Sequence, residues 1–355
     1  MFGNRYRGRK VLVTGHTGFK GSWLCLWLTY LGAEVTGVSL PETESPNHWE
    51  LLGLGINDRR VDIRDRKAVE AVIEQAAPEV LFHLAAQSLV RRSYRDPLDT
   101  WSTNVIGTAN VLQACRKVPV AAVIVVTTDK VYANHEWPWP YRENDRLGGY
   151  DPYSASKAAC EIVVDSFRKS FFENAGTLVA SARAGNVIGG GDWGEDRLIP
   201  DAIRAISSKQ PLVVRSPSAV RPWQHVLECT AGYLLLGQKL LEGDRQFASA
   251  WNFGPDAART RTVQQVIEAM KESWPELKWY PIEADKELHE TSCLYLDASK
   301  ARVLMNWNCI WSIEQTLSVA IQWYHALSES GRCLSSEQLA LYIEDARKGA
   351  LWAQA

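Results

Sequence analysis

Three glycines, Gly15, Gly18 and Gly21, follow an apolar stretch near the N-terminus and precede a stretch of helical character. Glycine loses more backbone freedom on folding than any other residue, so three glycines at three-residue spacing need a physical reason. A strand entering such a turn and a helix leaving it bring backbone N–H groups and the positive end of the helix to one point, where an anion binds. The turn therefore predicts that the pyrophosphate of a dinucleotide lies against the main chain.

Apolar, β-branched runs alternate with helical patterns over the first half of the chain. Buried strands are expected at 10–14, 34–40, 80–84, 121–127 and 178–183, and helices at 22–31, 66–76, 103–116 and 153–172. Such alternation is typical of a parallel sheet with helices on both faces. The sequence therefore predicts an α/β fold with a Rossmann-type, doubly wound parallel sheet.

This rhythm stops after Gly185. Residues 186–221 are rich in Gly, Pro, Asp and Arg, and short mixed segments replace the regular units from 255 onward. A helix at 226–241 and a strand at 250–253 are expected between them, so the chain returns to the first domain. A chain of 355 residues is long enough for two unequal units. We expect a dinucleotide-binding domain of residues 1–185 with a return at about 226–254, and a smaller, discontinuous lobe of residues 186–225 and 255–355.

The composition argues against several classes of protein. A formal net charge of −2 disfavours nucleic acid as the main partner, because proteins that bind it usually carry a basic excess. Seven scattered cysteines without a C-x-x-C pair disfavour a metal site or a disulfide framework and suit a reducing compartment. No window approaches the about 18 apolar residues of a membrane span, and the N-terminus lacks the apolar core of a signal peptide. We expect a cytoplasmic protein.

The end of the second expected strand lacks the acidic residue that commonly binds the adenosine ribose of NAD. Ser39 stands there, so this position leaves the choice between NAD and NADP open. Asp62 and Ile63 follow a short possible strand and are candidates for holding the adenine edge. An equally good interpretation makes Asp62 the cap of a helix that opens at Arg64.

Two short motifs carry the candidate chemistry. Tyr153 and Lys157 are four residues apart on an expected helix, so they share one face. A nearby ammonium favours the phenolate, which lets a tyrosine with an ordinary pKa of about 10 act as a base near neutral pH. Thr128, Asp129 and Lys130 follow an expected strand, at the edge where open α/β sheets place their chemistry.

With these residues the chain resembles the extended short-chain dehydrogenases/reductases that act on nucleotide sugars. The resemblance rests on the glycine turn, on Leu84-Ala85-Ala86-Gln87, on Asn104 and Thr128, and on Tyr153 with Lys157. In the epimerases of that family the stretch at Thr128 is Ser-Ser-x-x-Val-Tyr without an adjacent acid, whereas Thr-Asp-(Glu/Lys) is typical of the 4,6-dehydratases. The longer blocks TGHTGFKG, TTDKVY, YRENDRLGGYDPYSASK, RAGNVIGGGDWGEDRLIPD and RPWQHV resemble the CDP-glucose 4,6-dehydratases, over about residues 10–323.

The resemblance implies conversion of CDP-glucose to CDP-4-dehydro-6-deoxyglucose with loss of water, a step toward deoxysugars of O-antigen or related polysaccharides. It implies that Tyr153 takes the proton of the sugar O4 while hydride passes from C4 to NAD, and that Thr128 hydrogen-bonds the same oxygen. A base then removes the C5 proton as Asp129 protonates the departing 6-hydroxyl, and hydride returns to C6. Lys130 is either that base, which requires a neutral amine, or an electrostatic helper that stays protonated. Because the cofactor ends as it began, we expect NAD.

The expected ligand contacts follow from the motifs and the resemblance. The cofactor residues are Gly15, Thr17, Gly18, Phe19, Gly21, Ser39, Asp62, Ile63, Leu84, Ala85, Ala86, Gln87, Asn104, Tyr153 and Lys157. The substrate residues are Gln87, Ser88, Asn186, Gly191, Arg197 and Arg221. Arg183, Arg197 and Arg221 suit a diphosphate, because guanidinium groups pair with phosphate oxygens, although a surface position is the simpler interpretation of any one of them. His83 and His225 are expected to be structural.

Three alternatives compete with this interpretation. The first is a UDP-sugar 4,6-dehydratase, because some of those enzymes also carry Asp-Lys, and the second is a UDP-sugar 4-epimerase, which Asp129 disfavours. The third is a dinucleotide-sensing scaffold without catalysis, and the intact Thr128, Asp129 and Tyr153 argue against it. The resemblance also implies a homodimer or a dimer of dimers, formed through helices 103–116 and 153–172.

Overall fold

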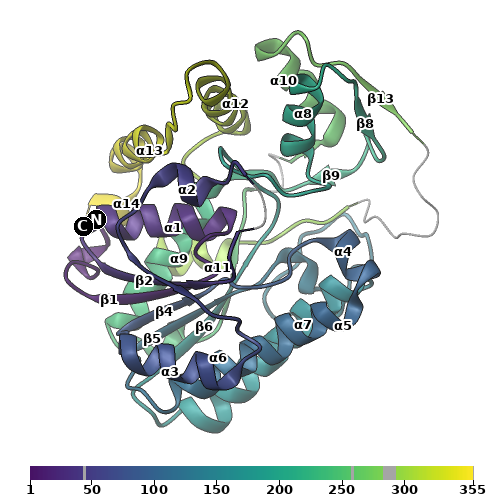
Figure 1. The fold of residues 1–355 in the computed structure, drawn as a ribbon. Coiled ribbons are helices and arrows are strands. Elements are labelled where there is room, and N and C mark those ends of the chain that lie inside the picture. The colour runs from purple at the N-terminus through teal and green to yellow at the C-terminus, as the bar shows by residue number, and fades with distance from the viewer. Residues whose placement is uncertain (43–44, 257–259, 283–292, 355) are drawn as a thin grey trace.

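The computed structural model describes residues 1–42, 45–256, 260–282 and 293–354. Its centre is a seven-stranded parallel sheet with the strand order β11-β6-β5-β4-β1-β2-β3 (Figure 1). The strands are β1 Lys10–Thr14, β2 Glu34–Ser39, β3 Asn57–Arg60, β4 Val80–His83, β5 Ala122–Val126, β6 Leu178–Ala184 and β11 Ala250–Phe253. The strand order reverses between β1 and β4, which confirms the predicted doubly wound arrangement.

Helices cover both faces of this sheet. In Figure 1, α1 and α9 lie on one face, and α3, α6 and α7 lie on the other. The helices are α1 Phe19–Tyr30, α2 His48–Leu52, α3 Arg66–Ala76, α4 Val90–Arg95, α5 Pro97–Trp101, α6 Gly107–Cys115, α7 Pro152–Phe167, α8 Leu198–Ser207, α9 Val226–Leu241, α10 Val263–Ser273, α11 Ser299–Met305, α12 Ile313–Ser330, α13 Ser335–Gly349 and α14 Leu351–Gln354. A search of the described residues finds no helix with the length and apolar character of a membrane span.

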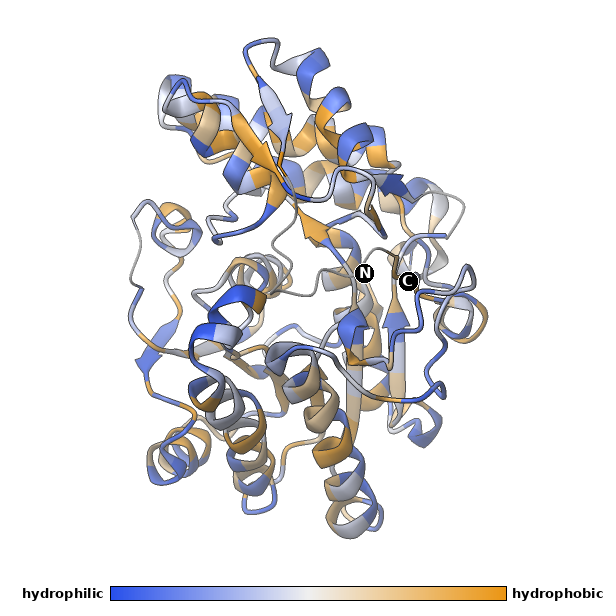
Figure 2. Ribbon diagram, turned by 90° about the vertical axis from the view of Figure 1, so that its right-hand side faces the viewer, coloured by the Kyte–Doolittle hydropathy of each residue, from blue (hydrophilic) through white to orange (hydrophobic). Residues whose placement is uncertain are grey.

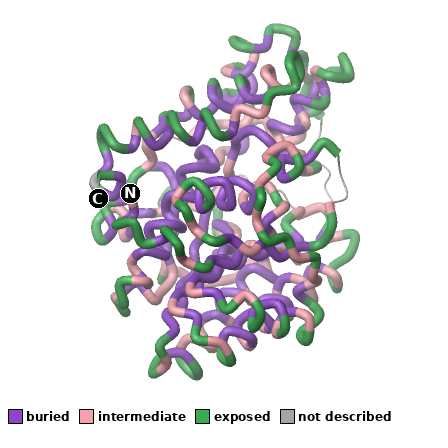
Figure 3. Tube along the Cα trace, turned by 60° about the vertical axis from the view of Figure 1, so that its left-hand side comes forward, coloured by how far each residue is buried: buried purple, intermediate pink, exposed green. Residues whose placement is uncertain are grey.

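Alternate side chains of each strand enter two separate cores, so the strands read as continuous apolar runs. Val11 and Val13 of β1 belong to the core that contains Trp23 and Trp27 of α1. Leu12, between them, belongs to the core on the side of α3 and α6. Figure 3 shows that the buried parts of the chain gather in the interior around the sheet. Burial on both faces is what a doubly wound sheet requires.

Most predicted elements agree with the structure within one to three residues. β1, α3, α9 and β11 have the predicted bounds. The predicted helix 103–116 is divided instead, because a π-helical turn at Ser102–Ile106 precedes α6. The predicted helix 153–172 begins one residue earlier, after the Asp151 cap, and ends in a second π-helical turn at Arg168–Phe172. The short helices α2, α4 and α5 were missed, because five or six residues carry too little periodicity to show a helix. The expectation of short mixed segments from 255 onward is wrong, because that part of the chain forms the longer helices α10, α12 and α13.

A smaller lobe stands over the carboxyl edge of the sheet, at the top of Figure 2. It contains α8 and α10, together with strand pairs whose members come from distant parts of the chain. These pairs are β8 Leu212–Val214 with β13 Trp279–Pro281, and β9 Val220–Arg221 with β12 Arg261–Thr262. A third pair, β7 Val187–Ile188 with β10 Gln224–His225, lies in the segment that leads into the lobe and back. The lobe has a core of its own, in which Ile199, Met270 and Trp274 pack with Trp323.

The C-terminal third of the chain divides between the two units. Trp323 and Tyr324 of α12 belong to the core of the smaller lobe. Trp307 and Tyr342 belong instead to the core beneath α1 and α9. The buried Glu228 of α9 fixes this second group, because its carboxylate accepts the Tyr342 hydroxyl at 2.6 Å. Part of the segment 255–355 therefore packs with the sheet domain rather than with the smaller lobe.

Candidate active site

A cleft of about 800 Å³ lies between the carboxyl edge of the sheet and the smaller lobe. The parallel register sets Thr14 beside His83, and His83 beside Val125, so β1, β4 and β5 end together at this edge. The loops that follow these strands line one wall of the cleft, and residues of the segment 186–223 line the other. The cleft therefore lies where an open α/β sheet places its ligands.

The glycine turn is shaped first by contacts within the chain. Gly15 has a φ of +73°, and a Cβ there would lie 2.7 Å from the backbone of Ala85. A Cβ on Gly21 would lie 2.0 Å from the Gly15 carbonyl oxygen. Gly18 is the N-cap of α1, and no side chain caps this helix end. Two of the glycines thus let backbone meet backbone, and the third leaves the first N–H groups of α1 to a ligand.

Most of the residues expected to bind the cofactor line the cleft. These are Gly15, Thr17, Gly18, Phe19, Gly21, Ser39, Asp62, Ile63, Leu84, Ala85, Ala86, Tyr153 and Lys157. The uncapped start of α1 and the close turn before it fit the pyrophosphate of a dinucleotide, which needs N–H donors and a backbone without side chains.

Gln87 and Asn104 do not line the cleft. The Asn104 side chain accepts the Gln87 N–H at 2.8 Å and donates to the Ser156 hydroxyl at 2.8 Å. The Gln87 side chain donates to the Thr100 hydroxyl at 2.9 Å and accepts the Leu89 N–H at 2.6 Å. Both side chains fasten the loop after β4 to its neighbouring helices, and a direct contact of either with a ligand stays a prediction.

Ser39, at the end of β2, is engaged with its neighbours. Its hydroxyl lies 3.0 Å from the Thr17 hydroxyl and donates to the Leu40 carbonyl at 2.8 Å. Glu42 lines the cleft and accepts a hydrogen bond from Arg60 at 2.8 Å. A carboxylate therefore does stand near this strand end, three residues later than the expected position.

Asp62 lines the cleft but caps no helix. α3 begins at Arg66, and its N-cap is Asp65. Asp62 accepts the Arg64 N–H at 2.8 Å and pairs with the Arg64 guanidinium at 2.6 Å, contacts that lower the pKa of Asp62. The interpretation of Asp62 as the cap of a helix opening at Arg64 is wrong, because the helix starts two residues later. A contact of Asp62 with adenine stays a prediction.

Thr128, Asp129, Lys130, Tyr153 and Lys157 all line the cleft. Thr128 donates to the Asp129 carboxylate at 2.9 Å and lies close enough to the Tyr153 phenol to act on its pKa. The second oxygen of Asp129, Oδ2, is buried and has no hydrogen-bond partner among the described residues. A buried carboxyl oxygen in this state suits a hydroxyl group of a ligand. An acid and a tyrosine are thus joined through one threonine.

Burial governs the protonation of the tyrosine and the lysine. It raises the pKa of Tyr153 to about 12, although the Thr128 hydrogen bond and the Arg197 charge act to lower it. Burial also lowers the pKa of Lys157, whose side chain donates to the Val126 carbonyl at 3.2 Å. The expected fall of the tyrosine pKa beside the lysine is not found in this structure. The reason is that desolvation of the phenolate outweighs the nearby positive charges.

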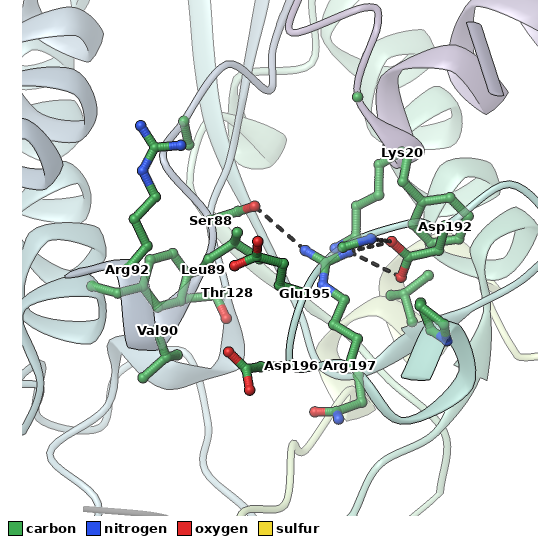
Figure 4. A pocket seen from close by; sticks show the side chains of 18 of the residues that line it. Lys20, Ser88, Leu89, Val90, Arg92, Thr128, Asp192, Glu195, Asp196 and Arg197 are labelled. Carbon is green, nitrogen blue, oxygen red and sulfur yellow. Dashed lines mark hydrogen bonds and ion pairs between the residues drawn. The ribbon is translucent and has the colours of Figure 1, made fainter. Parts of the chain in front are cut away.

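Arg197 bridges the two walls of the cleft. Its guanidinium donates to both oxygens of the buried Asp192, at 2.9 and 3.0 Å, and reaches the Ser88 hydroxyl on the opposite wall at 3.4 Å (Figure 4). The attraction of Asp192 raises the pKa of Arg197, so the guanidinium is a fixed positive charge there. The other expected substrate residues on this wall are Asn186, Gly191 and Arg221.

Arg183 lies outside the cleft. It belongs to β6, and it forms a buried ion pair with Glu161 at 2.8 Å. The expectation that Arg183 contacts a diphosphate is wrong, because the strand extends to Ala184 and the side chain still points into the packed interior.

Several charged residues of the cleft were missed by the sequence analysis. The basic ones are Lys20, Arg91, Arg92 and Arg215. Arg91 of α4 pairs with Asp196 at 3.7 Å, and Arg95 pairs with Glu195 at 3.3 Å. Figure 4 shows Glu195, Asp196 and Arg197 entering the cleft from the same loop. The sequence does show that the segment VRRSYR is basic and the segment DWGED acidic. It does not show that the two segments meet across the cleft.

Comparisons with known proteins agree with this geometry. The model of the NAD dependent epimerase/dehydratase family matches residues 11–254. A CDP-glucose 4,6-dehydratase of Salmonella typhimurium is 44% identical over 331 residues, which cover 91% of this chain and 92% of that protein. A dTDP-glucose 4,6-dehydratase of Haemophilus influenzae is 26% identical over 88% of this chain and 97% of that protein.

Solved structures show the same fold at lower sequence identity. An epimerase of Methanothermobacter thermautotrophicus has a TM-score of 0.82 at 23% identity, covering 92% of this chain and 95% of that one. A UDP-glucose 4-epimerase of Thermus thermophilus, in complex with NAD, has a TM-score of 0.78 at 24% identity, covering 89% and 98%.

His83, beneath the cleft, predicts a loss of stability in mild acid. Burial lowers the pKa of His83 to about 3, helped by the charge of Lys157, whereas an unfolded histidine titrates near about 6.5. Below that pH the unfolded state binds a proton that the folded state does not, so the free energy of unfolding falls as the pH is lowered. Between about pH 7 and about pH 5 we expect the wild type to lose about 2 kcal/mol more than His83→Gln, measured by urea unfolding.

His83→Gln is the matched variant because it does not titrate and keeps polar groups where His83 meets Thr14 and Thr108. Those hydroxyls lie 2.7 and 2.9 Å from the two imidazole nitrogens. Parallel pH profiles of the two proteins would show that His83 does not carry this sensitivity.

Proposed function

Because the chain belongs to the NAD dependent epimerase/dehydratase family, we propose that it converts CDP-glucose to CDP-4-dehydro-6-deoxyglucose with loss of one water. The observation that carries the proposal is the position of Asp129, which accepts from Thr128 beside Tyr153 and keeps a buried oxygen without a partner in the described part of the chain. A general acid and a general base thus share one cleft, as oxidation followed by elimination requires. The similarity to the Salmonella typhimurium dehydratase supports CDP as the nucleotide.

The reaction needs a base at O4 of the glucose and an acid at O6. Bound NAD supplies a reversible two-electron oxidation and ends as it began. Tyr153 takes the proton of the 4-hydroxyl, and Thr128 hydrogen-bonds the same oxygen. Asp129 protonates the departing 6-hydroxyl. The C4–H, C5–H and C6–O bonds break and water leaves. The hydride removed from C4 would be returned to C6 by the bound NAD, and C5 regains a proton from solvent, so the loss of one water is the only net change in the nucleotide sugar. Lys130 serves either as the C5 base or as a charge that stabilises the intermediate enolate.

The diphosphate of the substrate belongs, in this proposal, between Arg197 and Arg221, since both line the wall of the smaller lobe. A planar guanidinium group binds two phosphate oxygens at once and loses little conformational entropy per hydrogen bond. Ser88, Asn186 and Gly191 line the same space, and Gln87 acts by holding the loop that carries Ser88.

Exposed apolar side chains support a homodimer. Leu98 and Trp101 of α5, Ile106 of the π-helical turn and Ile162 of α7 are 79%, 39%, 54% and 61% exposed. These three elements pack against one another, so the exposed side chains lie on neighbouring helices. A gathering of apolar groups of this kind is typical of an interaction surface. Two copies pair through this face in our proposal, and sedimentation equilibrium of the protein measures this pairing.

All seven cysteines are free thiols, which suits the cytoplasm.

The function is tested with a panel of nucleotide-glucoses carrying CDP, UDP or dTDP. With NAD present, we expect a product lighter by one water from CDP-glucose and much less from the others, measured by mass spectrometry. A product lighter by one water from UDP-glucose at a similar rate would favour a UDP-sugar dehydratase. A change of configuration without loss of water would favour an epimerase, and no turnover at all would favour a dinucleotide-sensing scaffold.

Tyr153 and Asp129 serve different steps, so their variants are expected to fail differently. Tyr153→Phe removes the base at O4, and it should abolish both loss of water and any transient reduced-nicotinamide absorbance. Asp129→Asn keeps that base and removes only the acid, so reduced nicotinamide should accumulate while loss of water falls by a factor of about 100 or more. Equal loss of both signals in Asp129→Asn would contradict the assignment of the acid to the second step.

Arg221→Ala is expected to weaken binding of CDP-glucose and of free CDP by similar factors. A charge-assisted hydrogen bond contributes about 1.5–3 kcal/mol, which corresponds to about ten- to a hundredfold in affinity measured by calorimetry. Arg332→Ala is the control, because Arg332 is exposed and pairs with Glu337 at 3.2 Å outside the cleft. Unchanged affinity of Arg221→Ala for CDP would remove Arg221 from the diphosphate site.

A further inference from the structure

A buried ion pair lies beneath the turn that carries the proposed acid. Glu161 of α7 and Arg183 of β6 approach to 2.8 Å, and each side chain is only 3% exposed. Removing two charges from water has a large solvation cost, and an apolar pair of similar volume is often as stable. The geometry that such a pair imposes is therefore a better explanation of it than stability alone.

The pair holds both ends of the turn. The Thr127 hydroxyl donates to Glu161 Oε1 at 2.5 Å, and Arg183 Nη1 donates to the Tyr132 hydroxyl at 2.9 Å. Residues 128–130, which include the proposed acid, lie between these two hydrogen bonds, which we call the two tethers. Each tether is buried, so water does not compete with it.

The carboxylate of Glu161 is a permanent acceptor. Burial is the largest influence and acts to raise its pKa, but the charge of Arg183 and the hydrogen bonds from Ser181 and Thr127 hold the pKa of Glu161 below its ordinary value. Ser181 Oγ donates to Oε2 at 2.6 Å, beside the Arg183 guanidinium. The Thr127 hydroxyl therefore has a partner whose charge does not change near neutral pH.

α7 presents three residues at four-residue spacing to the end of β5, and such residues share one helical face. They meet three consecutive residues of the chain. Tyr153 lies beside Thr128, Lys157 donates to the Val126 carbonyl, and Glu161 accepts the Thr127 hydroxyl. The helix that carries the proposed base is thus fixed in register against the strand end that carries the proposed acid.

We propose that the Glu161–Arg183 pair positions this turn for the elimination step, so that Thr127, Glu161, Arg183 and Tyr132 are positioning residues for Asp129. The inference rests on the proposed dehydratase function. Tyr153 is held by α7 itself, whereas Asp129 lies in a turn that depends on the two tethers. Loss of a tether therefore displaces the acid more than the base, and a displacement of about 1 Å is enough to slow a step by about a hundredfold.

Thr127→Val tests the first tether, because it removes the hydroxyl and keeps the volume. We expect loss of water from CDP-glucose to slow about tenfold or more, with reduced-nicotinamide absorbance accumulating during turnover and KM for CDP-glucose changing by less than about twofold. Thr127→Ser, which keeps the hydroxyl, should restore the wild-type ratio of the two signals. Tyr132→Phe removes the second tether and should shift the ratio in the same direction.

Ser181→Ala is the matched control, because Ser181 donates to the same carboxylate from β6 rather than from the turn. Ser181→Ala should lose about as much thermal stability as Thr127→Val, and it should keep the wild-type ratio of reduced nicotinamide to released water. A purely structural role predicts equal slowing of both signals, and the same ratio in Thr127→Val, Tyr132→Phe and Ser181→Ala. That result would overturn the positioning role.

The test separates this inference from the proposed function. If the wild type releases water from CDP-glucose and neither tether variant changes the ratio, only the positioning role fails. If the wild type does not act on CDP-glucose, both fail. If Thr127→Val does not fold, the ratio in Tyr132→Phe alone decides.

Discussion

The close approach of two backbone segments at the start of α1 is the constraint on which the whole cleft depends. The turn after β1 touches the loop after β4 at Gly15 and closes on itself at Gly21, where a Cβ would meet main-chain atoms at 2.7 and 2.0 Å. A side chain at Gly15 would push away the loop with Ala85, and a side chain at Gly21 would push away Gly15 and the turn itself. Contacts within the chain are therefore enough to require glycine at positions 15 and 21. Gly18 is less crowded, since a Cβ there would lie 3.3 Å from the Gly15 carbonyl oxygen, and it stands at the uncapped end of the helix.

Local patterns were enough to predict the frame of the fold, and most of the predicted site residues do line the cleft. A strand buried on both faces is an unbroken apolar run, so β1, β5 and β6 could be found from sequence. The direction of a side chain near a strand end is not a local property. Arg183 was placed at the last residue of its strand, but the strand continues by one residue and keeps the guanidinium in the interior. The Asn104 carboxamide likewise meets the Gln87 backbone because the loop after β4 packs against the π-helical turn, which no spacing shows.

Spacing predicted a lowered pKa for Tyr153, whereas the structure raises it. The cause again lies in contacts that are not local in sequence. Spacing places Lys157 one helical turn away, but the depth of burial and the groups that meet the phenol come from other elements. The charges that act on the phenol include Asp129 from the turn after β5 and Arg197 from the opposite wall. Arg197 is in turn fixed by Asp192, so the smaller lobe contributes to the chemistry of a residue on the sheet domain. The contact between the two walls and the electrostatics of Tyr153 are thus linked through Arg197.

The acid beside the base has an electrostatic consequence that distinguishes a dehydratase from an epimerase. A negative charge on Asp129 raises the pKa of Tyr153, so an ionised carboxylate at this position opposes the phenolate that takes the proton from O4. A carboxyl group that carries its proton opposes it much less, and that is also the form that can protonate a departing hydroxyl. In the proposed reaction a proton carried by Asp129 therefore acts twice: it removes the charge that opposes the phenolate, and it is the proton that the departing hydroxyl needs. An epimerisation releases no hydroxyl and has no use for the second of these effects, whereas the proposed loss of water uses both.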